Sequence, residues 1–251
     1  MKLLQREREI MDILSKRKTA KTQYLCKQLF CSEATIRRSL VKLEQAGLIK
    51  RFHGGATLIP DKNIEYPHFY REKKRQKEKT YISDLAFDFI GNGDTLFLDS
   101  SSTVATLCTK LDHFKNLTVI TNGLQIALML SKFNNIDVYI AGGIVKKSSL
   151  SVIGQLSSQF IGDFTVDLAF ISCRGMDKCG IYEADPNQAL TKKHMIDNAN
   201  QTILLSDHTK MNHQHLYKLT DFNQIDAFIT NQKPDDLLLT SIQNKGCEVV
   251  F

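Results

Sequence analysis

The 251-residue sequence has no run of apolar residues long enough to span a bilayer. Charged residues interrupt its first segment, MKLLQREREIMDIL, so the uninterrupted apolar stretch of a signal peptide is missing. The six cysteines are scattered without a CxxC pair, which supports neither a zinc site nor a disulfide framework. These absences predict a globular cytoplasmic protein with reduced thiols and no metal.

Glycine-rich nucleotide loops are also missing. The sequence contains neither a GxGxxG fingerprint nor a GxxxxGK[ST] loop. Neither a dinucleotide nor a nucleoside triphosphate is therefore indicated, and we expect no cofactor.

What the sequence does contain is an uneven distribution of charge. Residues 1–60 hold 13 Lys and Arg against 5 Asp and Glu, and residues 61–80 hold 7 against 4. The remaining residues, 81–251, hold 13 basic and 18 acidic side chains. A basic head before an acidic body predicts that the head binds a polyanion. The alternative is a basic surface without a partner.

The head reads as three short helices. Apolar residues recur at helical spacing over residues 3–14, which predicts the first helix. A second helix is expected after Thr22, whose hydroxyl can cap it. Ser32 is a suitable N-cap for a third helix, and Gly47 is suited to ending that helix in a left-handed conformation.

The third helix has an apolar stripe for the core, formed by Ile36, Leu40 and Leu43. At 100° per residue, Arg38 lies almost opposite this stripe. Arg37 lies on the flank, four residues after Glu33, where it can form an intrahelical ion pair. The outer side of the helix is therefore slim, polar and basic, as a recognition helix in the major groove of DNA must be.

A basic hairpin follows. Residues 48–52 predict a strand, residues 53–55 a glycine-rich turn and residues 56–59 the returning strand. Such a wing would contact the DNA backbone beside the helix. The predicted DNA-binding residues are Ser32, Ala34, Thr35, Arg37, Arg38, Lys42, Lys50, Arg51, His53 and Gly54.

In this order, the helix and hairpin resemble the winged helix-turn-helix of the DeoR family of bacterial transcription regulators. The matching residues are SEATIRR at 32–38, Leu43-Glu44, Gly47 and HGGA at 53–56. Ser39 stands where the family usually has an aspartate. The resemblance implies binding to operator DNA. A solvated basic helix, the alternative, would not also need the hairpin and its glycines.

Residues 61–80 alternate in charge and predict a solvated linker between a DNA-binding domain, 1–60, and an effector domain, 81–251. A helix from about Thr80 to Ile90 is expected to open the second domain. The alternative for the lysines of REKKRQKEKT is contact with a phosphate.

Short apolar runs then alternate with helical segments, which predicts a buried, mainly parallel sheet in an α/β domain. The runs are 94–99, 117–122, 137–143, 168–173, 202–207, 226–231 and 247–251. Polar residues and glycines gather where these strands end, and this edge of an open α/β sheet is where ligands bind.

One strand end predicts a phosphate site most clearly. Asp99 ends a strand, and Ser100 to Thr103 begin a helix, so backbone N–H groups and hydroxyls converge there. The alternative is simple N-capping by one serine.

The body, in turn, resembles the sensor domain of the same family, which is similar in fold to ribose-5-phosphate isomerases and binds phosphorylated sugars or related metabolites. The matching stretches are GDTLFLDSSST, LTVITN, AGGIVKKSSLSVIGQ, DLAFISCRGMDKCGIYEAD and LLSDHTK. Gln188 and Tyr182 replace the glutamate and threonine that are frequent in the family.

The resemblance implies that Asp99 binds a sugar hydroxyl, that Asp207 and Lys210 form a strand-end Asp-x-x-Lys pattern, and that Lys192 is the family's helical lysine. The predicted effector-binding residues are Asp99, Ser100, Ser101, Ser102, Thr103, Thr121, Asn122, Gly142, Gly143, Lys192, Asp207 and Lys210.

Together these features predict a homo-oligomeric transcriptional regulator, a dimer or tetramer, that represses a sugar-utilisation operon under the control of a sugar phosphate. The alternative is a sugar-phosphate isomerase or transferase with an accessory DNA-binding head, because two carboxylates and two lysines can transfer protons. No base has an evident orienting partner, so no catalytic residue is assigned. A third hypothesis is an architectural DNA-binding protein with an inactive pocket.

Overall fold

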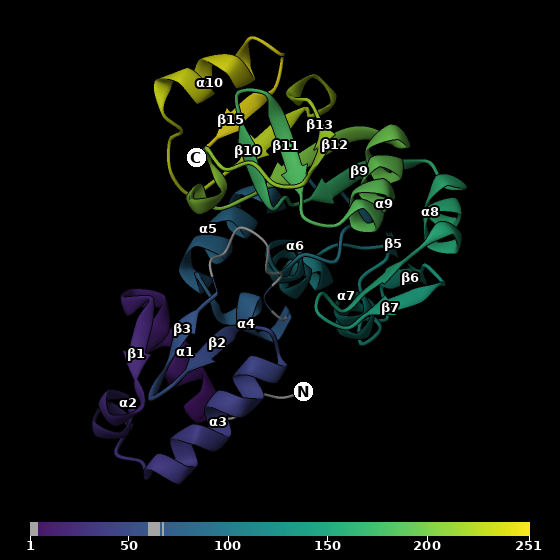
Figure 1. Cartoon of the computed structure of the whole chain (residues 1–251). Coiled ribbons are helices and arrows are strands. Elements are labelled where there is room, and N and C mark those ends of the chain that lie inside the picture. Colours follow the sequence, from purple (N-terminus) through teal and green to yellow (C-terminus); the bar gives the residue numbers. More distant parts are fainter. Residues whose placement is uncertain (1–4, 60–65, 67) are drawn as a thin grey trace. The chain divides into compact units, whose positions relative to one another are not determined.

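The computed structural model describes residues 5–59, 66 and 68–251 and divides into two compact units, Met1–Tyr70 and Arg71–Phe251 (Figure 1). Leu3 and Leu4 of the predicted first helix, and positions 60–65 and 67, mostly in the predicted linker, lie outside the described residues. No described helix has the length and apolar character needed to cross a membrane.

The N-terminal unit is a winged helix. Its elements are α1 (Gln5–Arg17), β1 (Thr19–Lys21), α2 (Thr22–Leu29), α3 (Glu33–Gln45), β2 (Ile49–Phe52) and β3 (Gly55–Leu58). The strands form an antiparallel sheet in the order β1-β3-β2. The predicted stripe of α3 is fully buried and packs against Ile10, Leu14 and Leu25 of the other two helices.

Both predicted ends of α3 are confirmed. The Ser32 hydroxyl accepts a hydrogen bond from the backbone N–H of Thr35 at 3.3 Å. At the other end Gly47 has a φ of 69°, and the next N–H, that of Leu48, donates to the Leu43 carbonyl at 3.0 Å. This closes the last turn of the helix in a Schellman arrangement.

The predicted capping role of Thr22 is wrong. Thr22 is the first residue of α2, Lys21 precedes it, and no side chain caps the helix. The reason is the short strand β1, which the sequence did not reveal. The chain passes directly from this strand into the helix, and the N–H of Thr22 donates to the Gly54 carbonyl at 2.8 Å.

The wing turn is also tighter than expected, because Gly55 belongs to β3 and pairs with Phe52. A Cβ at position 55 would lie 2.5 Å from the carbonyl oxygen of Ala20 on β1. Glycine is therefore required here by the close approach of a third strand.

The larger unit is built around a seven-stranded sheet in the order β15-β14-β12-β9-β4-β5-β6. Its strands are β4 (Thr95–Leu98), β5 (Leu117–Thr121), β6 (Ile136–Ile140), β9 (Val166–Ile171), β12 (Ala199–Leu205), β14 (Ala227–Ile229) and β15 (Glu248–Val250). Every neighbouring pair is parallel. All seven apolar runs in the sequence form these strands, so the predicted α/β class is confirmed.

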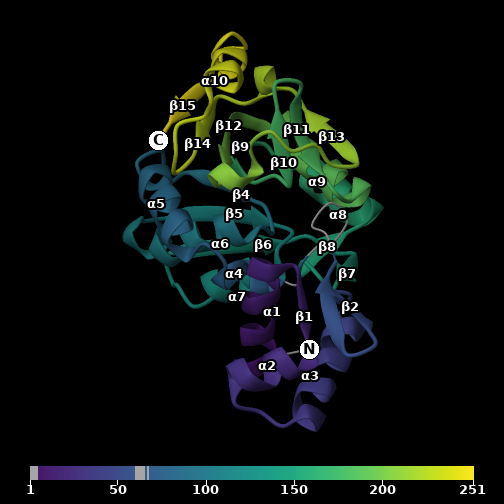
Figure 2. The same cartoon turned by 60° about the vertical axis from the view of Figure 1, so that its left-hand side comes forward.

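Helices cover both faces of this sheet (Figure 2). One core contains Leu96 and Leu98 of β4 with residues of α5 (Gln76–Phe87), α6 (Ser102–Leu107) and α7 (Leu124–Leu130). The other contains Phe97 with residues of α8 (Gln155–Gly162), α9 (Pro186–Asp197) and α10 (Asp236–Gln243). Alternate residues of β4 thus pack on opposite faces.

The sequence analysis did not predict the remaining helices and strands individually. They are α4 (His68–Lys73), the hairpin β7 (Ile144–Lys146) and β8 (Ser151–Ile153), the antiparallel set β10 (Gly175–Asp177), β11 (Gly180–Glu183) and β13 (Tyr217–Thr220), and the 3-10 turns Cys108–His113, His208–Lys210 and Phe222–Gln224. The strands have only three or four residues, too few for a clear alternating pattern. The helix expected from about Thr80 begins earlier, at Gln76, and ends at Phe87.

Candidate functional site

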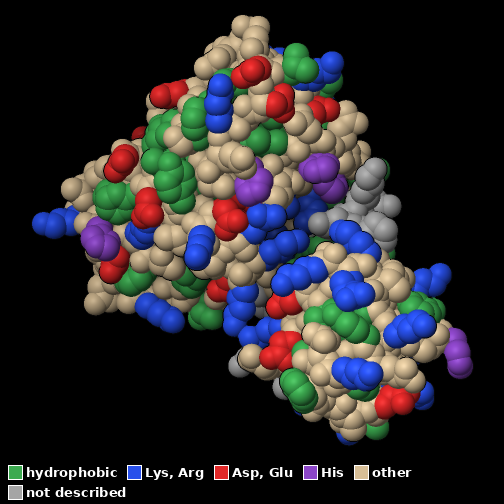
Figure 3. Space-filling view, turned by 90° about the vertical axis from the view of Figure 1, so that its left-hand side faces the viewer, with side chains coloured by type: hydrophobic (Ala, Val, Ile, Leu, Met, Phe, Trp, Pro, Cys, Tyr) green, Lys and Arg blue, Asp and Glu red, His purple; other side chains and the backbone are tan. Residues whose placement is uncertain are grey.

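The predicted recognition surface lies on the outer side of α3 and on the wing. Of the ten predicted DNA-binding residues, most are exposed and Thr35 is half-buried. Arg37 forms the expected ion pair with Glu33 at 2.6 Å, whereas Arg38 points away from the apolar core and is exposed. On the face shown in Figure 3, Lys and Arg side chains outnumber Asp and Glu over this smaller unit.

Arg51 connects the wing to α3. Its Nε lies 2.6 Å from Oε2 of Glu44, and its backbone N–H donates to Oε1 of the same carboxylate at 3.0 Å. These two hydrogen bonds lower the pKa of Glu44 below its ordinary value. Arg51 therefore holds the orientation of the hairpin, while Lys50 and His53 are exposed on it.

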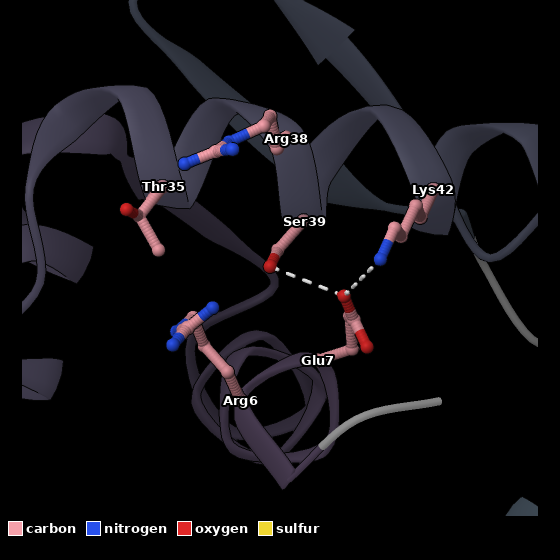
Figure 4. A pocket seen from close by; sticks show the side chains of 6 residues that line it. All are labelled: Arg6, Glu7, Thr35, Arg38, Ser39 and Lys42. Atoms are coloured by element: carbon pink, nitrogen blue, oxygen red, sulfur yellow. Dashed lines mark hydrogen bonds and ion pairs between the residues drawn. The ribbon is translucent and has the colours of Figure 1, made fainter. Parts of the chain in front are cut away.

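Ser39, at the position of the family's usual aspartate, faces inward and is 2% exposed. Its hydroxyl donates to Oε1 of Glu7 on α1 at 3.2 Å, and Nζ of Lys42 lies 3.6 Å from the same oxygen (Figure 4). The carboxylate beneath the recognition helix thus comes from α1. Lys42, predicted to contact DNA, is directed toward this buried glutamate.

In the larger unit, Asp99 and Lys192, both among the predicted effector-binding residues, meet at the carboxyl edge of the sheet. Asp99 is fully buried, and its carboxylate accepts the N–H groups of Ser101 and Ser172, each at 2.8 Å. Nζ of Lys192 lies 2.9 Å from Oδ2 of Asp99. The aspartate is therefore held in one orientation by three donors.

Lys192 also binds Glu183, which sequence reasoning missed, and donates to the Ser172 carbonyl at 2.5 Å. Burial alone would lower the pKa of Lys192, but the carboxylates of Asp99 and Glu183 raise it above the ordinary lysine value. Lys192 is thus a fixed cation. The sequence did contain one signal for Glu183, which is an isolated glutamate at the end of the apolar run GIYE. A carboxylate buried in such a run needs a cationic partner.

The serine-rich helix start has two different roles. Ser101 is the N-cap of α6, and its hydroxyl accepts the N–H of Val104 at 3.2 Å. The N–H of Ser101 is itself bonded to Asp99, so part of the expected backbone cradle is already occupied. Ser100, Ser102 and Thr103 are buried, and Oγ of Ser102 accepts a hydrogen bond from Nζ of Lys79 at 2.9 Å.

Lys79 corrects the prediction of a solvated charge run. Its neighbours Lys73, Lys74 and Lys77 are exposed as expected, but Lys79 is 4% exposed and reaches Ser102 from α5. Burial lowers the pKa of Lys79 to about 8, an effect that the charge of Asp207 opposes. The helical period of α5 decided this, because it turns one lysine of the run toward the start of α6.

Asp207 forms the other side of this cluster. Thr209 donates its N–H and hydroxyl to Oδ1 of Asp207, and Nε of Arg75 lies 3.8 Å from that oxygen. Burial alone would raise the pKa of Asp207, but the Thr209 bonds and the charge of Lys210 hold it below the ordinary value. Arg75, Lys79 and Lys210 thus act electrostatically around one buried aspartate.

The end of β5 lies beside Ser100 at the serine-rich start of α6, since a Cβ at Gly123 would lie 3.1 Å from Cα of Ser100. The Thr121 hydroxyl donates to the Leu98 carbonyl at 2.6 Å. Asn122 is 3% exposed and donates to the Val152 carbonyl at 3.1 Å, while its Oδ1 has no hydrogen-bond partner in the described part of the chain. A buried amide oxygen of this kind is available to a ligand hydroxyl.

The two predicted glycines of the site have different surroundings. A Cβ at Gly143 would lie 2.7 Å from the Ile153 carbonyl oxygen of β8, so this glycine permits the packing of the hairpin. A Cβ at Gly142 would meet nothing within 4 Å. The close approach at Gly143 is therefore to the β7–β8 hairpin and not to the residues around Asp99 or Asp207.

Comparison with known proteins connects both sites to one family. Residues 6–62 match the DeoR-like helix-turn-helix domain, and residues 74–232 match the DeoR C-terminal sensor domain. The chain is 33% identical over 241 residues to the HTH-type transcriptional repressor GlcR of Bacillus subtilis (strain 168), with 96% of this chain and 93% of that protein covered. The Glycerol-3-phosphate regulon repressor of Escherichia coli (strain K12) is 30% identical over 235 residues, with 93% of each covered.

Solved structures resemble the chain more distantly. Ribose 5-phosphate isomerase A of Methanocaldococcus jannaschii has a TM-score of 0.41 at 14% identity, with 55% of each chain covered. The tetrameric eIF2B-beta2-delta2 complex of C. thermophilum has a TM-score of 0.48 at 12% identity over 68% of this chain and 61% of that one. The family assignment depends on the sequence matches, which extend over both units. The chain belongs to the DeoR family of transcriptional regulators, with a helix-turn-helix domain followed by a sensor domain.

Proposed function

We propose that this regulator is a cytoplasmic repressor that binds operator DNA through α3 and the wing and is controlled by a phosphorylated sugar or polyol in the sensor domain. The observation that carries the proposal is the buried cluster of Lys79, Ser102 and Asp207 at the strand ends of a chain that also has an exposed basic recognition helix. DNA binding and small-anion binding are thus both available in one molecule.

The cations around Ser102 suit a phosphate. Lys79 donates directly to this hydroxyl, and Arg75 and Lys210 add positive charge around Asp207. Charge-assisted hydrogen bonds from lysine and arginine are the strongest that proteins offer to phosphate oxygens. The E. coli relative is named for a glycerol-3-phosphate regulon, which agrees with a small phosphorylated effector.

The second cluster suits the hydroxyl groups of the same effector. Asp99 offers a buried carboxylate whose orientation is fixed by Ser101, Ser172 and Lys192. Asn122 adds an amide oxygen without a hydrogen-bond partner among the described residues. An effector with both a phosphate and several hydroxyls would satisfy the Asn122 amide oxygen, which a simple anion leaves unpaired.

A binding role is favoured over catalysis. Lys192, one of the two lysines that the enzyme alternative requires, is a poor base near neutral pH, because Asp99 and Glu183 raise its pKa and keep it charged. We therefore propose that the chain is not an isomerase or transferase. Incubation with pentose and hexose phosphates, followed by product analysis, tests this. Measurable turnover that disappears in Lys192→Met would establish the enzyme instead.

We also propose that the protein is a homo-oligomer, at least a dimer. One winged helix reads few base pairs, whereas two related by a two-fold axis read two half-sites. Sedimentation velocity of the full chain at micromolar concentration, with and without DNA, should give a species larger than the monomer. A monomer under both conditions contradicts this proposal.

The decisive experiment is a thermal-shift screen against paired phosphorylated and free sugars and polyols. A ligand well above its Kd adds RT ln(1 + [L]/Kd) to the stability of the folded state. We expect one phosphorylated compound to raise the melting temperature and to change operator affinity, and its free counterpart to do neither. If no phosphorylated compound changes either quantity, the proposed effector class is wrong.

A further inference from the structure

The winged helix contains a cavity of about 220 Å³ between α1 and α3 (Figure 4). Its lining residues are Arg6, Glu7, Thr35, Arg38, Ser39 and Lys42. The predicted DNA-binding residues include three of these from α3 but none from α1. The cavity therefore adds a second helix to the surface on which DNA binding is proposed.

The charges around this cavity are not balanced. Glu7, the single acidic residue of the lining, is 1% exposed and is engaged by Ser39 and Lys42. Within residues 5–59, 66 and 68–251, Arg6 and Arg38 form neither a hydrogen bond nor an ion pair. Two guanidinium groups thus face the same cavity without a carboxylate of their own.

The orientation of the two arginines agrees with a shared ligand. In Figure 4 the Arg6 side chain rises from α1 toward α3, and the Arg38 side chain extends along α3 above it toward Thr35. Arg6 is half-buried and Arg38 is exposed, so the pair is open to solvent on the side of Arg38. Arginine forks of this kind fit the oxygens of a phosphate group.

We propose that Arg6 and Arg38 together hold one phosphate of the DNA backbone, so that α1 contributes a direct DNA contact. This inference rests on the proposed DNA-binding function. It gives Arg38 a backbone-positioning role beside any contact with a base edge, and it makes Arg6 part of the interface. Backbone contacts of this type fix the register of a recognition helix on the duplex.

The serine at position 39 bears on whether the two arginines are available to DNA. An aspartate at this position would place a carboxylate in the cavity lining, beside the two arginines and near Glu7. That carboxylate would compete with the DNA phosphate for the same guanidinium groups. With serine, the carboxylate of Glu7 is already engaged by Ser39 and Lys42, and both arginines are available to DNA.

The test uses the full-length protein and a fluorescent 24-base-pair duplex of random sequence, with anisotropy measured over a series of salt concentrations. The slope of log K against log salt changes by about 0.9 for each DNA phosphate that the protein neutralises. Arg6→Ala should bind several-fold more weakly, with a slope smaller by up to that amount, because Arg38 alone then faces the phosphate. Arg6→Lys should keep most of the slope.

The matched control is Lys16→Ala, which removes one exposed charge in the last turn of the same helix. Lys16 lies about 15 Å along the helix axis from Arg6, from the 1.5 Å rise per residue. The slope of log K against log salt for Lys16→Ala should equal that of the wild type. Equal decreases in Arg6→Ala and Lys16→Ala would overturn the inference, because the effect would then be one of overall charge.

Free phosphate is the other source of the same ligand chemistry. The melting temperature is therefore measured with inorganic phosphate and with chloride at equal ionic strength, for the wild type and Arg6→Ala. If phosphate stabilises only the wild type while both proteins bind the duplex equally, the cavity is a site for a free anion and the inference is wrong.

Ser39→Asp provides an independent variant, since it leaves both arginines in place. It should weaken duplex binding several-fold, and a second substitution, Glu7→Gln, should not restore it. Circular dichroism melting checks that each variant is folded. Wild-type affinity and slope in Arg6→Ala overturn the inference while the proposed function survives, whereas absence of DNA binding in the wild type removes the proposed function itself.

Discussion

At the scale of single residues, burial converts ordinary charged side chains into specific binding groups. Lys79 belongs to a run of lysines that look alike in the sequence, yet it alone among Lys73, Lys74, Lys77 and Lys79 is buried. Its pKa of about 8 reflects the cost of keeping a charge out of water. A bound phosphate would lower this cost by supplying an opposite charge.

The first prediction concerns this lysine. Lys79→Met should weaken binding of the phosphorylated effector by about 1.5–3 kcal/mol, roughly tenfold to a hundredfold in Kd, because a charged donor to the phosphate is removed. Isothermal titration calorimetry measures the change. Lys77→Met, on the exposed side of α5, is the control and should bind like the wild type. Equal affinity of the two variants would place the phosphate elsewhere.

The second prediction is a pH dependence. Effector affinity should fall as the pH rises through about 8, because Lys79 then loses the proton that favours a phosphate. The second pKa of a phosphate ester is near 6, so the ligand charge hardly changes above about pH 7. Titrations on either side of the Lys79 pKa of about 8 should show this decrease for the wild type and a flat profile for Lys79→Met.

The same shift also affects the stability of the unliganded protein. The pKa of Lys79 is about 8 in the folded state and 10.5 ordinarily, so between these values the unfolded chain binds more protons. Stability therefore gains a contribution that rises from about pH 8 to pH 10.5. Lys79→Met should lack this contribution in urea unfolding, measured against pH.

At the scale of elements, α3 and the wing are connected by backbone geometry as well as by the Arg51–Glu44 pair. Gly47 adopts a φ of 69° and turns the chain from the helix into β2. A Cβ added there would meet nothing within 4 Å. Any cost of a larger residue is thus one of backbone conformation alone.

The third prediction follows from that geometry. Gly47→Ala should destabilise the protein by about 1–2 kcal/mol, the cost of a left-handed conformation for a residue with a Cβ. Gly47→Asn should cost less, since asparagine tolerates this region of φ. Urea unfolding of the full chain measures both. If alanine is as stable as glycine, the turn has rearranged.

At the scale of the whole molecule, regulation requires that the effector bind more tightly to one state of the protein than to another. The recognition helix belongs to one compact unit, and the cluster of Lys79, Ser102 and Asp207 belongs to the other. A change confined to the second should therefore alter the response to effector without removing the DNA-binding residues.

The fourth prediction tests this separation. Ser102→Glu would place a carboxylate within reach of Lys79, whose Nζ now lies 2.9 Å from the Ser102 hydroxyl. The new charge should pair with Lys79 and repel a phosphate, so the effector response disappears while operator affinity without effector is kept. Gel-shift titrations with and without effector measure both. A normal response would show that the phosphate binds elsewhere, and failure to bind operator would show that the units are strongly coupled.

The sequence by itself determined the elements that depend on local patterns. Seven apolar runs became seven parallel strands, and Ser32 and Gly47 mark the ends of α3 because capping depends on neighbouring backbone groups. The family and its two domains were also predicted from contiguous motifs. These features need only residues that are close in the chain.

Tertiary structure decided which charged groups meet. Lys79 and Ser102 are 23 positions apart, and Ser39 and Glu7 are 32 apart, so no local pattern connects them. Strand β1, too short for a periodic signal, displaced the expected cap at Thr22 by pairing with β3. Burial is set by the packing of whole elements, and burial is what gives these few polar groups their partners and their chemistry.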